Sequence, residues 1–190
     1  MELRADFELN FIAMAGKMIL YSAISADGYI AKKDGSVSWL EQIPNPEKED
    51  FGYAAFYDSV EITIMGHNTY RQIETFDGPF PYRDTKNYVI THRESMEDND
   101  NVSFISNEIP EFVKSLKRNS KKDIWLVGGS QTNLLMLQND LIDEVILFMM
   151  PIFIGDGIPL FGSEYEVPLQ LKQHEIYSNG VVEVRFDLKT

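Results

Sequence analysis

The most constraining feature of the chain is a Gly-Gly pair between two apolar segments, in residues 123–162, DIWLVGGSQTNLLMLQNDLIDEVILFMMPIFIGDGIPLFG. Residues 124–127 are typical of a short buried strand. Gly128 and Gly129 permit a tight turn with close backbone approach, and Ser130 can cap a helix over residues 130–138. The N-terminus of such a helix attracts anions. A Gly-Gly pair alone is more often an ordinary strand-to-helix turn, so other segments must support the anion site.

Strand and helix patterns alternate along the chain without a linker or an internal repeat. This alternation predicts one α/β domain. Strands are expected at residues 18–25, 61–65, 86–90, 102–105, 124–127 and 141–150. Residues 29–31 are expected to continue the first strand after a turn at Asp27 and Gly28. Helices are expected at residues 46–58, 109–118 and 130–138.

The C-terminal part of the sequence predicts an antiparallel hairpin. Residues 174–177 and 181–188 have strand patterns, and Ser178, Asn179 and Gly180 form a turn signal between them. A parallel core that ends in such a hairpin makes a mixed sheet.

Length and composition fit one globular domain with a full core, since the chain has 190 residues and is 44% hydrophobic. We expect this domain at residues 18–190, after an extension or leader at residues 1–17 that lacks the pattern of a secretory signal. No apolar run approaches the roughly 20 residues that span a bilayer, so we expect a soluble protein.

The absence of cysteine excludes a disulfide framework, a thiolate metal site and a cysteine nucleophile, and it is compatible with the reducing cytoplasm. Three scattered histidines make no metal site by their spacing.

The formal charge of −13 disfavours polyanionic partners. It repels nucleic acid and anionic membranes at long range. A small phosphorylated ligand stays open, because salt screens a distant field within about 10 Å and local basic residues then dominate.

Four polar or glycine-rich segments follow the expected strands. They are SADGYIA at residues 25–31, IMGHNTY at 64–70, VITHRES at 89–95 and the Gly128-Gly129 turn. Ligands of open α/β sheets lie beyond the carboxyl ends of the strands. The four segments together predict a groove for a phosphorylated dinucleotide.

These segments resemble the dihydrofolate reductase superfamily, and within it the reductase domain at the C-terminus of the bacterial riboflavin-biosynthesis protein RibD and its stand-alone relatives. The stretch from WLVGGS to GIPLF is similar to the family pattern of Gly-Gly, Leu-rich helix, Asp-Glu, strand, Pro, Gly-x-Gly and Pro-Leu-Phe. The resemblance covers about residues 18–188. It implies an NADPH-dependent reductase, often a homodimer, with a three-layer dihydrofolate reductase-like fold: a mixed, mostly parallel sheet of about eight strands, flanking helices and a C-terminal antiparallel hairpin.

The resemblance also implies which residues bind the cofactor. Residues that resemble the nicotinamide pocket are Ala23 and Ile30. The segment that resembles the one at the pyrophosphate and adenosine phosphate holds Gly66, His67, Asn68 and Thr69. The segment that resembles the one around the 2′-phosphate holds Thr91, His92 and Arg93, and the pyrophosphate turn corresponds to Gly128, Gly129, Ser130 and Gln131.

His67 departs from the family pattern, because dihydrofolate reductases commonly have Arg or Lys at that position. A neutral imidazole binds a dianionic phosphate more weakly than a guanidinium does. Arg93 is the alternative source of positive charge. For His67 and His92, a ligand contact and an ordinary surface position both stay open.

Asp50 is the candidate catalytic residue. Counting back from Gly66 without a gap places it where folate-reducing members hold the pterin with a carboxylate. The resemblance then implies that Asp50 binds the substrate and helps its protonation, while NADPH supplies the hydride. Asp50 also ends the charge run at residues 47–50, so a solvated or N-terminal helix acid is the alternative.

Aromatic residues around Asp50 are candidates for the walls of the substrate site: Trp39, Tyr53, Phe56 and Tyr57. Trp39, Leu40 and Ile43 could form a lid over the nicotinamide. Packing of a helix face against the core is the alternative for all of them.

Two functions stay open. The first is an NADPH-dependent reductase that acts on a pyrimidine- or pterin-type heterocycle, most like 5-amino-6-(5-phosphoribosylamino)uracil reductase of riboflavin biosynthesis or dihydrofolate reductase. The second is a nucleotide-binding protein of the same fold without turnover. The apolar residues 145–154 suit a homodimer face or a core strand equally.

Overall fold

An eight-stranded sheet runs through the protein. The computed structural model describes residues 16–93, 95–163 and 165–188. The strands lie across the sheet in the order β5 (Ser103–Ile105), β4 (Lys86–Ile90), β3 (Val60–Gly66), β6 (Asp123–Gly128), β1 (Met18–Ser25), β7 (Glu144–Met150), β10 (Val182–Leu188) and β9 (Leu169–Ile176).

Neighbouring strands from β5 to β7 are parallel, and β10 is antiparallel to both β7 and β9. The predicted mixed, mostly parallel sheet with a C-terminal antiparallel hairpin is therefore confirmed. The turn at residues 178–180 joins the hairpin, where the Gly180 N–H donates to the Tyr177 carbonyl at 3.0 Å. The hairpin is longer than predicted, because β9 begins at Leu169.

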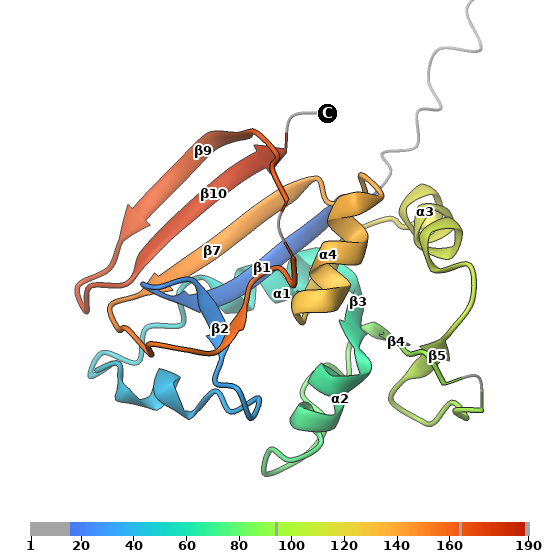
Figure 1. Ribbon diagram of the computed structural model, residues 1–190, viewed down its shortest axis with the longest axis horizontal. Helices are drawn as coiled ribbons and strands as arrows, with labels where there is room; N and C mark the ends of the chain where they lie inside the picture. The colour runs from blue at the N-terminus through green and yellow to red at the C-terminus, as the bar shows by residue number, and fades with distance from the viewer. Residues whose placement is uncertain (1–15, 94, 164, 189–190) are drawn as a thin grey trace, which may run out of the picture.

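Helices cover the sheet on both faces (Figure 1). They are the 3-10 helix η1 (Ser38–Gln42) and the α-helices α1 (Tyr53–Ser59), α2 (His67–Ile73), α3 (Ile109–Asn119) and α4 (Ser130–Gln138). Side chains of α3 and α4 pack in one core cluster, whereas Trp39 of η1 and Phe56 of α1 pack in another. These layers are the three-layer arrangement expected from the sequence.

Strand β1 shows how one apolar run serves both layers. Met18 and Leu20 enter the cluster that contains α3 and α4, while Ile19, Tyr21 and Ala23 enter the cluster that contains α1. Successive side chains of a strand point to opposite faces of the sheet. An interior strand of a parallel sheet is covered on both faces and therefore needs apolar residues at nearly every position.

Residues 29–31 do not continue β1, contrary to the prediction. They form a separate strand, β2 (Tyr29–Ala31), which pairs with β8 (Ile158–Pro159) in a two-stranded sheet. The cause is the turn after Ser25, where Gly28 has φ 88° and its N–H donates to the Ser25 carbonyl at 2.9 Å. The side-chain oxygen of Ser25 also accepts from the Tyr29 N–H at 3.0 Å.

The helix predicted at residues 46–58 is wrong over its first half, because α1 begins only at Tyr53. Phe51 and Gly52 have φ of 55° and 72°, which are values of the left-handed region and do not continue a right-handed helix. The carboxylate of Asp50 accepts from the Gly52 N–H at 2.9 Å and from the Ala54 N–H at 3.2 Å. Asp50 therefore lies just before the helix and satisfies its free N–H groups.

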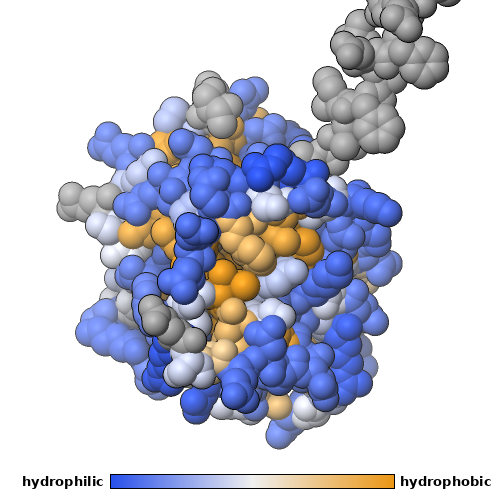
Figure 2. All heavy atoms as spheres, turned by 90° about the vertical axis from the view of Figure 1, so that its right-hand side faces the viewer, coloured by the Kyte–Doolittle hydropathy of each residue, from blue (hydrophilic) through white to orange (hydrophobic). Residues whose placement is uncertain are grey.

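Figure 2 views the side of the molecule on which α3, β4 and β5 lie. Its surface is mostly hydrophilic, with an apolar strip in a hollow between hydrophilic side chains. Among the described helices, none combines the length and the apolar character needed to cross a bilayer.

The packing predicts a contrast between two leucines. Leu126 on the central strand β6 is fully buried, whereas Leu171 on the edge strand β9 is 56% exposed. We expect Leu126→Ala to lower the free energy of unfolding by about 2–5 kcal/mol, because it leaves a cavity in the core. Leu171→Ala should change it by no more than about 0.5 kcal/mol. Urea denaturation of both variants measures the difference, and equal losses would contradict this placement of the two strands.

Candidate active site

The carboxyl ends of the parallel strands meet at one edge of the sheet. Met65 of β3 is in register with Gly128 of β6, and Gly66 is in register with Ile90 of β4. Thr91 directly follows Ile90. The predicted cofactor segments at residues 66–69, 91–93 and 128–131 are thus brought together, as the sequence implied.

Glycines allow the starts of α2 and α4 to approach each other closely. A Cβ on Gly66 would lie 2.5 Å from the side-chain oxygen of Thr132, and a Cβ on Gly129 would lie 3.0 Å from that of Thr69. Gly128 has φ 104°, and a Cβ there would lie 2.9 Å from Oδ1 of Asn133. The peptide bond between Gly128 and Gly129 is cis. Gly66, Gly128 and Gly129, which we call the glycine cradle, therefore allow a backbone packing that side chains at these positions would disturb.

Ser130 does not cap α4, contrary to the prediction. The N-cap residue is Gly129, and the Ser130 hydroxyl is buried without a hydrogen-bond partner among the residues that the structure describes. Leaving a buried polar group unsatisfied costs about 1–3 kcal/mol. The first N–H groups of a helix also lack partners within the helix. The hydroxyl and these N–H groups at the cradle fit an anionic group such as a pyrophosphate.

His67 begins α2 beside the cradle, Arg71 lies in the last turn of that helix, and Arg93 follows β4. Burial, together with the nearby positive charges of Arg93 and Arg71, lowers the pKa of His67 below its usual value of 6.5. The backbone N–H of Arg93 donates to the Thr91 hydroxyl at 3.1 Å, which fixes the turn after β4. Two arginines thus lie near His67 despite the overall charge of −13, and one of them, Arg71, forms an ion pair with Glu74 at 3.6 Å.

The other predicted cofactor residues have mixed positions. Asn68 and His92 are exposed near the cradle, and Ile30 is half-buried in β2. The side-chain amide of Gln131 lies against Gly162, so close that a Cβ at that glycine would collide with it. Ala23 differs from these residues, because it lines a pocket.

That pocket is a mainly apolar cavity of about 250 Å³ at the carboxyl ends of β1 and β7. Both strands, the helix η1, the segment between η1 and α1, and the hairpin turn contribute the residues that line it: Ala23, Leu40, Ile43, Asn45, Phe51, Met150 and Asn179. Leu40 and Ile43, two of the three residues predicted to form a lid over the nicotinamide, line it. This pocket is separate from the glycine cradle, although both lie at carboxyl ends of the sheet strands.

The predicted aromatic walls lie next to this pocket and do not line it. Phe56 stacks on Tyr21 with ring centres 4.1 Å apart, and Tyr53 stacks on Tyr57 at 5.8 Å. Both Tyr53 and Phe56 also contact the Trp125 ring edge-on. These contacts pack α1 on the sheet, as the alternative interpretation of the sequence proposed.

Trp39 is fully buried in the same layer, and its indole N–H has no hydrogen-bond partner among the described residues. Asp50 is exposed, and its carboxylate bonds the start of α1. These bonds match the helix-acid alternative, so the catalytic role of Asp50 stays a prediction.

Sequence reasoning missed four residues at the pocket: Asn45, Phe51, Met150 and Asn179. Phe51 was assigned to a helix, and Asn179 lies in the hairpin turn, more than 120 residues away along the chain. The side-chain amide of Asn179 donates to the Pro44 carbonyl at 3.1 Å. Only the long-range pairing of β10 with β7 brings this turn to the pocket.

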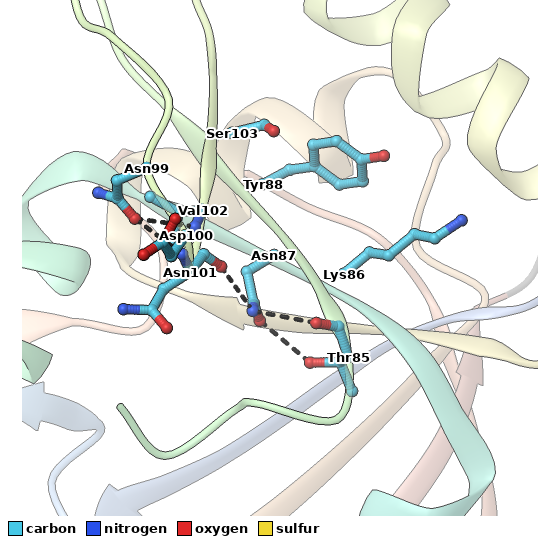
Figure 3. Close-up of a pocket in the computed structure, with 9 residues that line it drawn as sticks. All are labelled: Thr85, Lys86, Asn87, Tyr88, Asn99, Asp100, Asn101, Val102 and Ser103. Carbon is cyan, nitrogen blue, oxygen red and sulfur yellow. Dashed lines mark hydrogen bonds between the residues drawn. The ribbon is translucent and has the colours of Figure 1, made fainter. Parts of the chain in front are cut away.

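A second cavity, of about 320 Å³, lies between β4 and β5 and is lined by polar residues (Figure 3). Asn87 is one of its lining residues. The amide nitrogen of Asn87 donates to the carbonyls of Tyr82, Thr85 and Asn101 at 2.9–3.1 Å. Its amide oxygen accepts from the Thr63 hydroxyl at 2.6 Å. These bonds tie loops to the sheet near the start of β4, opposite the end that carries the cradle.

Comparison with known proteins agrees with this geometry. The chain matches the RibD C-terminal domain over residues 16–183. The uncharacterized protein YwjB of Bacillus subtilis (strain 168) is 36% identical over 169 residues, which are 88% of this chain and 96% of YwjB.

Solved structures extend the comparison to the fold. A protein of Shewanella sp. PV-4 provisionally assigned to riboflavin biosynthesis is 29% identical, with a TM-score of 0.82 over 92% of this chain and 99% of that one. Dihydrofolate reductase from Enterococcus faecalis, solved with NADP(H), has a TM-score of 0.66 over 93% of this chain and 99% of its own, at 11% identity. The latter similarity shows a dihydrofolate reductase-like fold alone.

The family match spans nearly the whole sheet, including the cradle at Gly66, Gly128 and Gly129. With the similarity to YwjB, it establishes that the chain belongs to the RibD C-terminal domain family of reductase-like domains.

Proposed function

We propose that the protein is an NADPH-dependent reductase that transfers a hydride to a pyrimidine- or pterin-type heterocycle. The substrate would be most like that of 5-amino-6-(5-phosphoribosylamino)uracil reductase of riboflavin biosynthesis or of dihydrofolate reductase. The observation that carries the proposal is the glycine cradle at the same sheet edge as an apolar pocket, together with the buried Ser130 hydroxyl, which has no hydrogen-bond partner within the described part of the chain.

The cofactor would lie along the carboxyl ends of β3, β6 and β1. Ser130 and the free N–H groups of α4 would bind its pyrophosphate. Arg93 and His67 would bind the 2′-phosphate. Arg93 carries positive charge, and His67, whose pKa is lowered in the free protein, would gain its charge with the phosphate bound. When bound, NADPH supplies the hydride. Ala23 would place the nicotinamide next to the pocket that holds the heterocycle.

The alternative is a nucleotide-binding protein of the same fold without turnover. The bonds of Asp50 to the start of α1 favour it, because an exposed carboxylate engaged with backbone N–H groups is a poor candidate for protonating a substrate. The reductase remains our proposal, since nucleotide binding alone would leave the apolar pocket without a ligand.

Two further expectations belong to the proposal. We place the protein in the cytoplasm, as its lack of cysteine suggests. We also propose a homodimer, supported by the exposed apolar side chains of the edge strand β9, where Leu171 is 56% and Ile176 is 70% exposed.

Titration with NADPH and NADH tests the cofactor half. We expect NADPH to bind more tightly, and Arg93→Ala to weaken NADPH binding by about tenfold or more, because it removes a charge-assisted bond to the 2′-phosphate. NADH binding should change little. Nicotinamide fluorescence and thermal stabilisation measure both affinities. Arg118→Ala, at an exposed position on α3, is the matched control. Equal losses for the two nucleotides would remove Arg93 from the 2′-phosphate site, and binding of neither would end the reductase proposal.

His67 predicts a pH dependence of NADPH binding. Its pKa is lowered in the free protein, and a bound phosphate dianion would raise it. The affinity for NADPH should therefore rise as the pH falls through the His67 pKa of the complex. It should level off once the pH is below the His67 pKa of the free protein. From about pH 8 to about pH 6 the gain should reach up to tenfold, which one unit of pKa shift supplies.

The control for this pH profile is His67→Gln, which cannot gain the charge. Protonation of the phosphate itself, near pH 6, affects both proteins equally. The ratio of wild-type to variant affinity is therefore the readout, and a ratio that stays constant over this range would exclude a phosphate contact of His67.

Asp50→Asn separates the two roles of Asp50. Asn also satisfies helix N-termini well, so the variant should keep its stability and its NADPH affinity. If Asp50 helps protonate the substrate, turnover should fall by about 10²-fold or more. Asp34→Asn is the control, because the Asp34 carboxylate also accepts a backbone N–H two residues on, at 2.9 Å, and lies outside the pocket. Unchanged turnover of Asp50→Asn would leave Asp50 as a helix acid only.

A further inference from the structure

Phe51 is the aromatic residue among the described residues that line the apolar pocket. The pocket volume of about 250 Å³ lies below the roughly 300–1,000 Å³ of sites for drug-sized ligands, so it fits one ring system rather than a whole dinucleotide. Ala23 of β1 contributes the smallest side chain of the lining. A flat ring above Ala23 would have Phe51 as the aromatic side chain of its surroundings.

The backbone of Phe51 is held in an unusual conformation. Its φ of 55° is a genuine outlier for a bulky residue. The Phe51 N–H donates to the Glu49 carboxylate at 3.1 Å, and the next N–H, that of Gly52, donates to Asp50 at 2.9 Å. Strained residues of this kind persist only where their surroundings impose them, and they gather at ligand sites.

The ring of Phe51 is held from the C-terminal hairpin. Tyr177 meets it edge-on, with ring centres 4.9 Å apart and an interplanar angle of 87°. The Tyr177 hydroxyl donates to Glu183 at 3.0 Å. Glu183 is only 1% exposed, and its other oxygen accepts from Arg185. A buried carboxylate with both oxygens bonded fixes the Tyr177 ring, and Tyr177 in turn fixes Phe51.

Polar groups at the rim of the pocket are already engaged. The Asn45 side chain bonds the backbone of Glu49 through both its oxygen and its nitrogen, each at 2.8 Å. The Asn179 side chain donates to the Pro44 carbonyl and accepts from the Val181 N–H. Recognition in this pocket therefore depends on ring contact more than on a charged partner.

We infer that Phe51 stacks on a neutral, planar heteroaromatic ring of the substrate, and that Tyr177 and Glu183 are positioning residues that hold it there. Phe51 thus determines specificity for flat ring substrates. This inference deepens the proposed function and rests on it, since it assigns the pocket to the heterocycle.

The test measures binding of 5,6-diaminouracil and of folate to the full chain saturated with NADP⁺, by calorimetry. Phe51→Ala should weaken probe binding by about tenfold or more, because it removes both ring contact and apolar area. Phe51→Tyr keeps the ring and should bind within about threefold of wild type. NADPH affinity should be unchanged in both. Phe153→Ala, at a 77% exposed phenylalanine outside the pocket, is the control.

The positioning role has its own readout. Tyr177→Phe keeps the ring and loses only the bond to Glu183, so probe binding should fall by about threefold to tenfold. Glu183→Gln keeps an acceptor for the Tyr177 hydroxyl. Its affinity for the probes should therefore be closer to that of the wild type than the affinity of Tyr177→Phe is. The double variant Phe51→Ala with Tyr177→Phe should bind no more weakly than Phe51→Ala alone, because the two residues act through one contact.

Each outcome decides a different point. Wild-type affinity of Phe51→Ala for both probes would overturn stacking, and losses that simply add in the double variant would overturn positioning. A wild-type protein that binds NADPH but neither probe would also overturn stacking, while leaving the cofactor proposal intact. Failure to bind NADPH would overturn the proposed function itself.

Discussion

The candidate site depends on one close contact, in which the backbone at the β3–α2 junction approaches the backbone at the β6–α4 junction. A Cβ on Gly66 would come within 2.5 Å of the Thr132 hydroxyl oxygen, and a Cβ on Gly129 would come within 3.0 Å of the Thr69 hydroxyl oxygen. This contact brings the starts of α2 and α4 together at the sheet edge. Parallel pairing of β3, β6 and β1 then aligns their carboxyl ends, so that the cradle and the pocket share one edge.

The two faces of the sheet are covered by different kinds of side chain. The face under α3 and α4 is aliphatic, with Leu126, Met136 and Val113 fully or almost fully buried, and it supplies a rigid core. The face under α1 is aromatic, where Tyr21 contacts the rings of Phe56, Trp125 and Phe148. Burial raises the pKa of Tyr21, with Glu183 adding to the effect, so its hydroxyl stays protonated beside the pocket. The pocket lies where this aromatic layer ends.

Sequence patterns were sufficient for the elements whose signals are local. Strands β1, β4 and β6 and helices α3 and α4 were predicted within one or two residues, because apolar periodicity and glycine punctuation mark them directly. The start of α1 was not predictable, since a left-handed Phe51 has no local signal and the charge run before it reads as helix. Ser130 failed as a cap because Gly129 takes the N-cap position and leaves the hydroxyl free.

The pocket itself was beyond local patterns for a different reason. Its walls come from β1, from the segment after η1 and from the turn of the last hairpin, and only the sheet pairing unites them. Family resemblance predicted the cofactor segments, because each of its motifs is a continuous stretch of the chain. The resemblance predicted fewer of the residues at the pocket. Ungapped counting selected Asp50 and did not select its neighbour Phe51, which lines the pocket.

The bond from Asn179 to Pro44 and the contact of Phe51 with Tyr177 have a consequence for the order in which the protein assembles. The cradle needs only residues that have been synthesised once α4 emerges, whereas the pocket waits for β10 to pair with β7. The residues of the cradle therefore leave the ribosome before the residues that complete the pocket. Loss of the hairpin through proteolysis or a premature stop would remove Asn179 from the pocket and Tyr177 from its contact with Phe51, while every residue of the cradle would still be present in the chain.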